Sequence, residues 1–507
     1  MIRHMLTGIA AALAVMISAP LAFAQTAAKP LIIATNIEPD TLDISSSRNA
    51  PNARQAMTNV TEPLVGFTTD GTPTPTIAEW ERSPDNKYID FKLRKGVKFH
   101  SGDELTAEDI VFSDARMREK TSIYRVRRNP TITRVEAVDK HTARFHMKQP
   151  DVTMLALRLL VVVSKSYYDR VGEDEFVRKP AGTGPYKVAE YKVGQYLDLV
   201  RNEDYWGEKP RLEKARFVFA KEDTTRTAML RTGEADMIVN ASFNDAEDLK
   251  KAGFKTAIVP VPTTLAFRFI SGSKVAPTRD VRVRRALAHA IDVNAIVKGL
   301  FQGVPATYPR LAPGDRGYDS NLKAYEYNPK LAKQLLAEAG YPNGFTMPLW
   351  YFTGGDVGVR ETVEAVTLYL RAVGVNVEPK GNDVGVRNET YIKYKNDPNA
   401  PMFFVSPTVQ AKNAETIDSL ASNHSASIAA TFVNEAFDKE FELAVASSDM
   451  KTHEEHVRRA VAIMHENVIS VPIWTMVSVF ATKPNIDYTP TEKVRFILAM
   501  LKDVKVN

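Results

Sequence analysis

The stretch that decides the fold runs from residue 88 to residue 113 and reads YIDFKLRKGVKFHSGDELTAEDIVFS. Apolar and polar residues alternate over 88–93, which predicts a strand with one buried face. Two glycines and an aspartate then predict turns. Thr106 stands three residues before Asp109, and this capping-box spacing predicts a helix over 107–119.

The rest of the chain continues this mixture of strands and helices without internal repeats. Residues 31–34 are a short apolar run typical of a buried strand, and two antiparallel strands are predicted within 131–150. In the second half, helices are predicted over 283–300, 328–340 and 358–372, and strands over 346–352 and 373–377. This alternation predicts a largely parallel sheet covered by helices, and hence an α/β fold.

The chain has 507 residues and a mass of 56.4 kDa, which predicts more than one domain at about 150 residues per domain. Hydrophobic residues make up 44% and charged residues 25%, as in ordinary soluble globular proteins. There is no cysteine, so disulfides, thiolate metal sites and cysteine nucleophiles are excluded. Lysine and arginine number 66 against 61 acidic residues, a balance that gives no argument for nucleic acid as a partner.

The first 24 residues have the three parts of a secretory signal peptide. A positive start at Arg3 precedes an apolar run over 5–17, and the small residues Ala22 and Ala24 end the segment. We expect cleavage after Ala24 and export to a bacterial periplasm, without a lipid anchor because no cysteine follows the cleavage point. An uncleaved membrane anchor is the alternative, but Pro20 interrupts the run before it reaches the roughly 20 residues that span a bilayer.

Motifs for familiar chemistries are mostly missing. There is no Walker motif, Gly-x-Ser-x-Gly elbow or dinucleotide fingerprint, and the Gly-Thr-Gly-Pro run at 182–185 predicts a turn. His453 and His456 enclose two glutamates, but their i,i+3 spacing misses the i,i+4 spacing of zinc proteases and indicates the solvated face of a helix. Three arginines within 125–128 indicate a surface loop, with anion binding as the alternative. We therefore predict no metal, no cofactor and no catalytic residue, although remote paired carboxylates leave no linear signature.

Several segments, taken together and in order, resemble the family-5 extracellular solute-binding proteins, the receptors of bacterial peptide, nickel and opine ABC importers. The segments that carry the resemblance are residues 61–67, 75–80, 91–102, 106–113, 182–186, 201–206, 230–236, 280–287 and 327–341. The block from 91 to 113 is the most specific of them. The resemblance spans roughly residues 31–485.

The resemblance implies a two-lobed periplasmic binding protein fold of the α/β class (type II, cluster C-like), with an extra α+β domain inserted in lobe one. It assigns 1–24 to the signal peptide, 25–65, 180–265 and 475–507 to lobe one, 66–179 to the inserted domain, and 266–474 to lobe two. It also implies a monomeric receptor, not an enzyme, that captures a small polar solute in an interlobe cleft. The solute would be peptide-like, opine-like or a sugar conjugate, and inner-membrane permease subunits would receive it. The alternative is an exported hydrolase that uses remote paired carboxylates.

Peptide-binding members of the family usually carry an aspartate in lobe two that pairs with the amino group of the peptide. The matching segment here is 402–413, which contains no acid but does contain Lys412. A buried ammonium without a counter-charge is costly, so we do not expect ordinary peptides, and an anionic or polyhydroxyl ligand fits better. The candidate contacts in this segment are Phe404, Ser406, Gln410 and Lys412. Glu415 or Asp418 is the alternative partner for an amine.

Further candidate ligand contacts come from the topology that the resemblance implies. Asn36 follows the first strand of lobe one, where such receptors place ligand contacts, although it could also simply start a turn. Arg268 lies where the chain re-enters lobe two and could bind a carboxylate bidentately, with a solvated strand arginine as the alternative. Trp350 and Phe352 end a strand, and alternation allows only some of these aromatic residues to face a ligand. Trp474 lies near the second lobe crossing, with core packing as the alternative.

Overall fold

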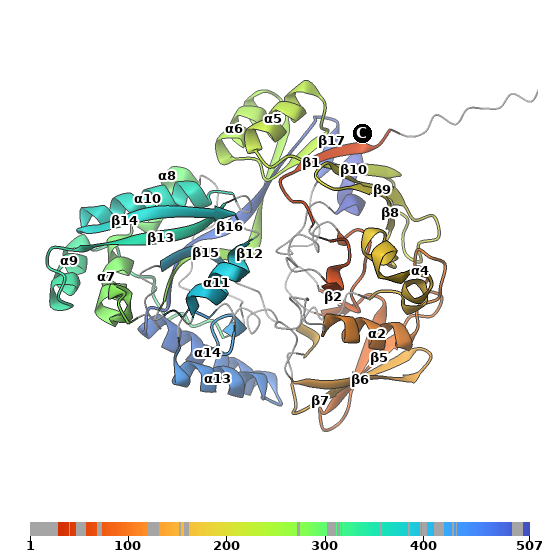
Figure 1. Ribbon diagram of the computed structural model, residues 1–507, viewed down its shortest axis with the longest axis horizontal. Helices are drawn as coiled ribbons and strands as arrows, with labels where there is room; N and C mark the ends of the chain where they lie inside the picture. The colour runs from red at the N-terminus through yellow and green to blue at the C-terminus, as the bar shows by residue number, and fades with distance from the viewer. Residues whose placement is uncertain are drawn as a thin grey trace, which may run out of the picture.

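The computed structural model describes most of the chain from residue 29 onward. The described residues are 29–39, 41–46, 57–67, 73–118, 131–151, 154–156, 162–270, 274–301, 311, 315, 317–353, 357–383, 386–395, 397, 403–409, 420–427, 430–431, 433–488 and 500–507. Two lobes lie side by side, with long strands passing between them (Figure 1). The mixed α/β class expected from the sequence is confirmed.

One sheet runs through both lobes. In spatial order its strands are β14 (Val375–Asp383), β13 (Phe345–Thr353), β15 (Phe403–Val409), β12 (Lys255–Phe269), β16 (Ser470–Thr482), β11 (Met237–Val239), β1 (Leu31–Thr35), β10 (Lys214–Phe219), β9 (Tyr196–Arg201) and β8 (Tyr186–Lys192). In lobe two, β13 pairs in parallel with both β14 and β15. The sheet as a whole is mixed, because β15, β12 and β16 pair antiparallel.

Strands β12 and β16 belong to both lobes. Residues 255–260 of β12 pair with the end of β16 beside β11, whereas residues 264–269 of β12 pair with β15 on the lobe-two side. The β12–β16 register shifts between Pro260 and Thr264, where Pro260 and Pro262 provide no backbone N–H for the ladder. The predicted lobe boundaries fall inside these two strands and stay a prediction.

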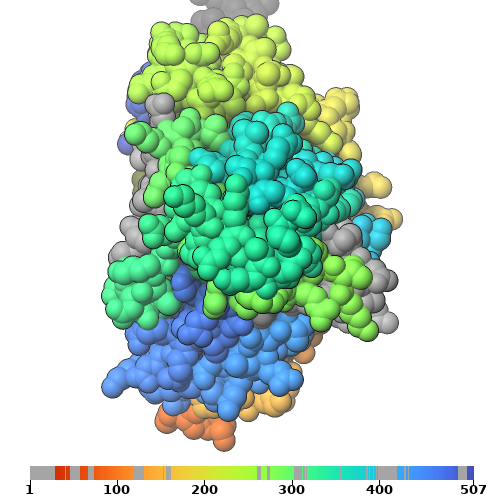
Figure 2. Space-filling view, turned by 90° about the vertical axis from the view of Figure 1, so that its left-hand side faces the viewer, coloured from red at the N-terminus to blue at the C-terminus, as the bar shows by residue number. Residues whose placement is uncertain are grey.

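Helices cover lobe two and part of lobe one. Those of lobe two are α7 (Val281–Ala290), α8 (Val293–Leu300), α9 (Pro329–Glu338), α10 (Val359–Ala372), α11 (Arg387–Lys395), α13 (Glu435–Val445) and α14 (Met450–Glu466). Helix α10 packs on β13 and β14, and α13 packs on α14. Figure 2 shows the outer face of lobe two, with the blue α13–α14 pair below the green and teal helices.

Lobe one carries α5 (Asp223–Thr232) and α6 (Phe243–Lys251) near the crossing strands, and α6 contacts both β12 and β16. It also holds β17 (Ile486–Tyr488) and β18 (Val504–Val506), while β2 (Val65–Phe67) pairs with β3 (Pro73–Pro75) at the start of the region 66–179. A single buried cluster joins the core of this lobe to that of the region 66–179. The two parts therefore share one hydrophobic core.

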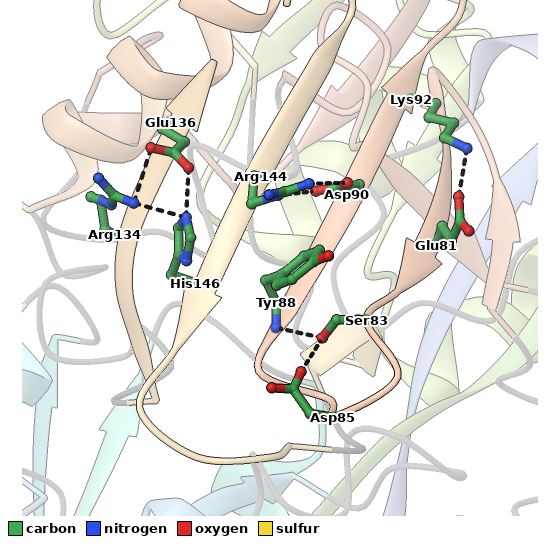
Figure 3. Close-up of polar contacts among 10 residues, drawn as sticks. All are labelled: Glu81, Ser83, Asp85, Tyr88, Asp90, Lys92, Arg134, Glu136, Arg144 and His146. Carbon is green, nitrogen blue, oxygen red and sulfur yellow. Dashed lines mark hydrogen bonds and ion pairs between the residues drawn. The ribbon is translucent and has the colours of Figure 1, made fainter. Parts of the chain in front are cut away.

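A separate four-stranded sheet lies within residues 66–179. Its order is β4 (Ala78–Arg82), β5 (Tyr88–Leu93), β7 (Thr142–Met147) and β6 (Ile132–Asp139), accompanied by α2 (Ala107–Met117) and α4 (Lys165–Arg178). One face carries cross-strand polar pairs (Figure 3). Both Arg144 Nε and Arg144 Nη2 donate to Asp90, each at 2.7 Å, and the guanidinium lies 4.0 Å from the centre of the Tyr88 ring. These pairs satisfy the charges on the face opposite the buried core.

The opening stretch folds as its sequence predicts. The expected strand over 88–93 is β5, and Asp109 Oδ2 accepts from Thr106 N at 2.8 Å in a capping box that begins α2. The single helix expected over 283–300 is wrong, because the chain forms α7 and α8 with a break at 291–292. Asp292 caps the second helix by accepting from Ala295 N at 2.9 Å.

No helix within the described part of the chain is both long enough and apolar enough to cross a membrane.

Candidate functional site

In lobe one, two asparagines lie where parallel strands end. Strand β1 runs parallel to both β10 and β11, so their carboxyl ends share one edge, where α/β folds place ligands. Asn36 follows β1, Asn240 follows β11, and Asn240 Nδ2 donates to Asn36 Oδ1 at 3.0 Å. Asn240 has a φ of 57°, a left-handed conformation that is uncommon outside glycine and tends to occur at functional positions.

Arg226 of α5 holds this edge in place. Its buried guanidinium donates to the carbonyl oxygens of Ala220 (2.8 Å), Lys221 (2.7 Å), Val239 (3.1 Å) and Asn240 (2.6 Å). Burial lowers the pKa of Arg226 to about 10, so the group stays charged at neutral pH. Sequence reasoning missed Asn240 and Arg226, although an asparagine directly after a short apolar run is the same signal that identified Asn36.

In lobe two, three of the predicted residues occupy one row across the sheet. Trp350 of β13 pairs with Phe404 of β15, and Phe404 pairs with Arg268 of β12. Directly paired residues share a face of the sheet, and Phe352 is on the same face because it lies two residues from Trp350. Ser406 holds the next position of that face on β15, opposite Ala266. The side chains of Phe404 and Ser406 are outside the description.

Arg268 is buried, not solvated as in the alternative prediction. Only 3% of its surface is exposed, and Nη2 lies 3.4 Å from Asn423 Oδ1. The guanidinium carbon lies 5.8 Å from the centre of the Tyr391 ring, which belongs to α11. Burial lowers the pKa of Arg268, and the Tyr391 hydroxyl partly opposes this shift. A desolvated cation thus lies beneath α11.

Further aromatic side chains lie near the Tyr391 ring that contacts this cation. Phe352 contacts Tyr391 at 5.8 Å between ring centres, and Trp350 contacts Tyr394 at the same distance. These residues form a small cluster of their own, separate from the main core. Within the described residues, the Trp350 Nε1 atom is buried and has no hydrogen-bond partner.

The prediction that Trp474 contacts the ligand needs correction. It is fully buried, it stacks on Phe301 at 4.2 Å between ring centres, and its Nε1 donates to Thr362 Oγ1 at 2.9 Å. Both contacts belong to the core beneath α8 and α10. We therefore assign Trp474 to packing.

Gln410 and Lys412 lie outside the described residues, as do the three arginines within 125–128.

The histidine pair on α14 lies in a helix that packs on α13, and no cluster of metal-ligating side chains occurs within the described residues. The expected solvated face is wrong for His453, which is 1% exposed and has Nδ1 2.8 Å from the carbonyl oxygen of Ala444. His456 Nδ1 lies 2.7 Å from Glu440 Oε2. Both histidines connect α14 to α13, because α13 packs on the side of the helix that they occupy.

A buried carboxylate joins three of the segments that carry the family resemblance. Glu62 is 8% exposed and accepts from Thr183 Oγ1 at 2.9 Å, Tyr205 Oη at 2.7 Å and Trp206 Nε1 at 2.9 Å. Burial raises the pKa of Glu62 above its ordinary value even though these three hydrogen bonds lower it. These hydrogen bonds hold the three segments together within lobe one.

The glycines of the 182–185 turn permit a close approach to the same region. A Cβ on Gly184 would lie 2.7 Å from the carbonyl carbon of Val60, too close for any side chain. His100 accepts from Gly182 N through Nδ1 at 3.3 Å, so the Nε2–H donates to the carbonyl oxygen of Gly184 at 2.8 Å. Burial lowers the pKa of His100 to about 4, which keeps the ring neutral.

Comparison with known proteins places this geometry in a family. The model of the bacterial extracellular solute-binding proteins, family 5 Middle, matches residues 72–422. Heme-binding protein A of Haemophilus influenzae is 28% identical over 438 residues, which cover 79% of this chain and 78% of that protein. The dipeptide-binding protein of Escherichia coli is 30% identical over 303 residues, 54% of this chain and 56% of that protein.

The fold of a solved structure matches that of this chain over nearly the whole length of both. The periplasmic binding protein DppA of Helicobacter pylori, in complex with the peptide STSA, has a TM-score of 0.81 and 25% identity. The match covers 94% of this chain and 98% of that one. The two-lobed periplasmic binding protein fold is thereby confirmed, and the exported-hydrolase alternative finds no support. This chain belongs to the bacterial extracellular solute-binding proteins of family 5.

Proposed function

We propose that this chain is the periplasmic receptor of an ABC importer, which captures a small polar solute between its lobes and delivers it to the permease subunits. The observation that carries the proposal is the pair of strands β12 and β16, which cross between the lobes and shift register at the crossing. Candidate contacts lie on both sides of this crossing, Asn36 and Asn240 in lobe one and the Arg268 row in lobe two.

The receptor would work by closing its two lobes around the solute. A solute held by one lobe alone gives no preference for a closed form, because only contacts made in one state shift an equilibrium toward it. Contacts from both lobes at once supply that preference, and closure presents the permease with a surface that exists only when solute is bound. The hydrogen-bonded asparagines and the buried arginine offer such contacts from opposite lobes.

Family-5 binding proteins are periplasmic, and we propose the same location for this chain after cleavage of residues 1–24 behind Ala24, without a lipid anchor. We also propose that it acts as a monomer and catalyses no reaction. The relatives are named for binding heme and dipeptides, so the family model leaves the ligand class broad. A peptide-like, opine-like or sugar-conjugate solute agrees with the polar groups of both lobes.

Binding without turnover tests this proposal. The mature chain, residues 25–507, is titrated by calorimetry against dipeptides, glutathione, opines, sugar conjugates and heme, and each mixture is followed by mass spectrometry for products. We expect one solute bound per chain, a raised melting temperature and unchanged solute. Turnover of a bound solute, or failure of every solute class to bind, would contradict the receptor function.

A further inference from the structure

We propose that the row Trp350–Phe404–Arg268 in lobe two is an anion subsite, in which Arg268 and the Trp350 indole N–H hold a carboxylate of the solute. The inference rests on the proposed receptor function and narrows it to solutes that carry a carboxylate beside an apolar or planar group. It arises from two donors placed in one row beneath α11.

The spacing of the row suits a carboxylate. Trp350 and Arg268 lie on strands separated by β15 alone, so their Cα atoms are about 10 Å apart. Both side chains are on the same face of the sheet, as their shared partner Phe404 shows. A group that binds both donors would lie over the position of Phe404, which stands between them in the row.

The chemistry of the two donors favours a negatively charged group of the solute. A guanidinium presents a planar fork of N–H groups that matches the two oxygens of a carboxylate. A carboxylate keeps further lone pairs for a third donor, and the Trp350 Nε1 atom is a buried donor with no acceptor among the described residues. The buried charge of Arg268 would repel an ammonium group, because both groups would be desolvated cations.

The aromatic rings near the row indicate which group should stand next to the carboxylate in the solute. Tyr391 lies against the guanidinium, Tyr394 against Trp350, and Phe352 against Tyr391. Trp350 is only half-buried, so part of its side chain is accessible to a solute. A planar or apolar group next to the carboxylate would pack on these rings and gain free energy from burial.

A fragment pair tests the subsite without knowledge of the natural solute. Benzoate and benzamide share a ring but differ in charge, and each is titrated into the full mature chain while the indole N–H signals are followed by NMR. The chain has four tryptophans, and the Trp350→Phe variant identifies the signal of Trp350. We expect benzoate to shift that signal and benzamide to leave it in place.

Variants separate the roles of the two donors. Arg268→Gln should weaken benzoate binding about tenfold or more, and Trp350→Phe by about three- to tenfold, since each removes a hydrogen bond to a charged group. Arg268→Lys should fall between these and the wild type, because lysine keeps the charge but not the planar fork. The exposed Arg360 of α10 provides the matched control, and Arg360→Gln should bind benzoate as the wild type does.

The outcomes distinguish this subsite from the receptor function. Absence of a benzoate shift, or an equal shift with benzamide, would overturn the subsite. Unchanged benzoate affinity in a folded Arg268→Gln variant, checked by circular dichroism, would also overturn it. If the wild type binds a solute from the calorimetric panel while Arg268→Gln binds that solute equally well, the subsite fails and the receptor stands. If no solute binds to the wild type, the receptor function itself fails.

Discussion

Replacing Glu62 should affect stability in proportion to the number of donors that lose their acceptor. Glu62→Leu leaves the donors of Thr183, Tyr205 and Trp206 buried without the carboxylate, and each such donor costs about 1–3 kcal/mol. The two hydroxyls can rotate but the indole N–H cannot, so we expect a loss of about 3–6 kcal/mol. Typical domains have only about 5–15 kcal/mol of stability, so this variant should be close to unfolding.

Glu62→Gln should cost much less and should remove a pH dependence. The amide oxygen still accepts hydrogen bonds, and the uncharged side chain avoids the desolvation of the carboxylate, so we expect a loss of about 1 kcal/mol. Burial raises the folded-state pKa of Glu62 above the ordinary 4.5, so the folded protein binds a proton more readily than the unfolded chain does. This group therefore adds stability as the pH falls through the raised pKa toward 4.5, and the gain is absent above that pKa.

The assay is urea unfolding of the wild type, Glu62→Gln and Glu62→Leu at pH 5 and pH 7, followed by tryptophan fluorescence. The exposed Glu208 provides the control variant Glu208→Gln, which should match the wild type at both values. On going from pH 7 to pH 5, the wild type should change in stability more favourably than Glu62→Gln. Equal pH responses, or equal stability of the Leu and Gln variants, would refute the assignment of Glu62 as a buried, triply bonded carboxylate.

Three further substitutions test other parts of the structure. Trp474→Ala should lower the free energy of unfolding by about 3–5 kcal/mol through the cavity it leaves, while calorimetric solute affinity of the folded protein stays unchanged; a selective loss of affinity would restore Trp474 as a ligand contact. Arg226→Lys should lose about 2–4 kcal/mol of stability and weaken solute binding, because the segment after β10 and the segment that carries Asn240 lose their shared donor; Arg231→Lys, exposed on the same helix, should do neither. His100 has a folded-state pKa of about 4 against an ordinary 6.5, so the unfolded chain binds more protons between these values and stability is lost as the pH falls from 6.5 toward 4, on the order of 3 kcal/mol; denaturation curves of His100→Gln should lack that loss.

Elements with local signals could be predicted from the sequence. The alternation in β5 and the capping box of α2 involve residues close together in the chain, so nothing distant is needed to place them. The break between α7 and α8 was missed because Asp292 could equally continue an alanine-rich helix, and its side chain decides by capping Ala295. His453 was assigned to solvent because its burial depends on α13, which packs on it from nine or more residues away.

For the candidate site, the sequence indicated which residues to consider, but it did not indicate whether their side chains are buried or exposed. Arg268 was identified by its place in the topology, yet nothing local shows that Tyr391 and Asn423, more than 120 residues further along the chain, cover it. The same limit applies to Trp474, where alternation allows either face and only the packing of Phe301 and Thr362 decides. Burial is a property of contacts between distant segments, and a single sequence carries no direct record of those contacts.

The structure also locates where the lobes can move. The hydrogen bonds of His100 with Gly182 and Gly184 and the shared core join residues 66–179 to lobe one, so that part should move as one body. Lobe two has its own core beneath α10. Between them the ladder of β12 and β16 is weakest at 260–264, where two prolines remove N–H donors and the register shifts. A bend there changes few hydrogen bonds, whereas a bend within residues 255–260 of β12 breaks a continuous ladder. Closure should therefore pivot at 260–264, bringing the Asn36 edge toward the Arg268 row while each remains intact.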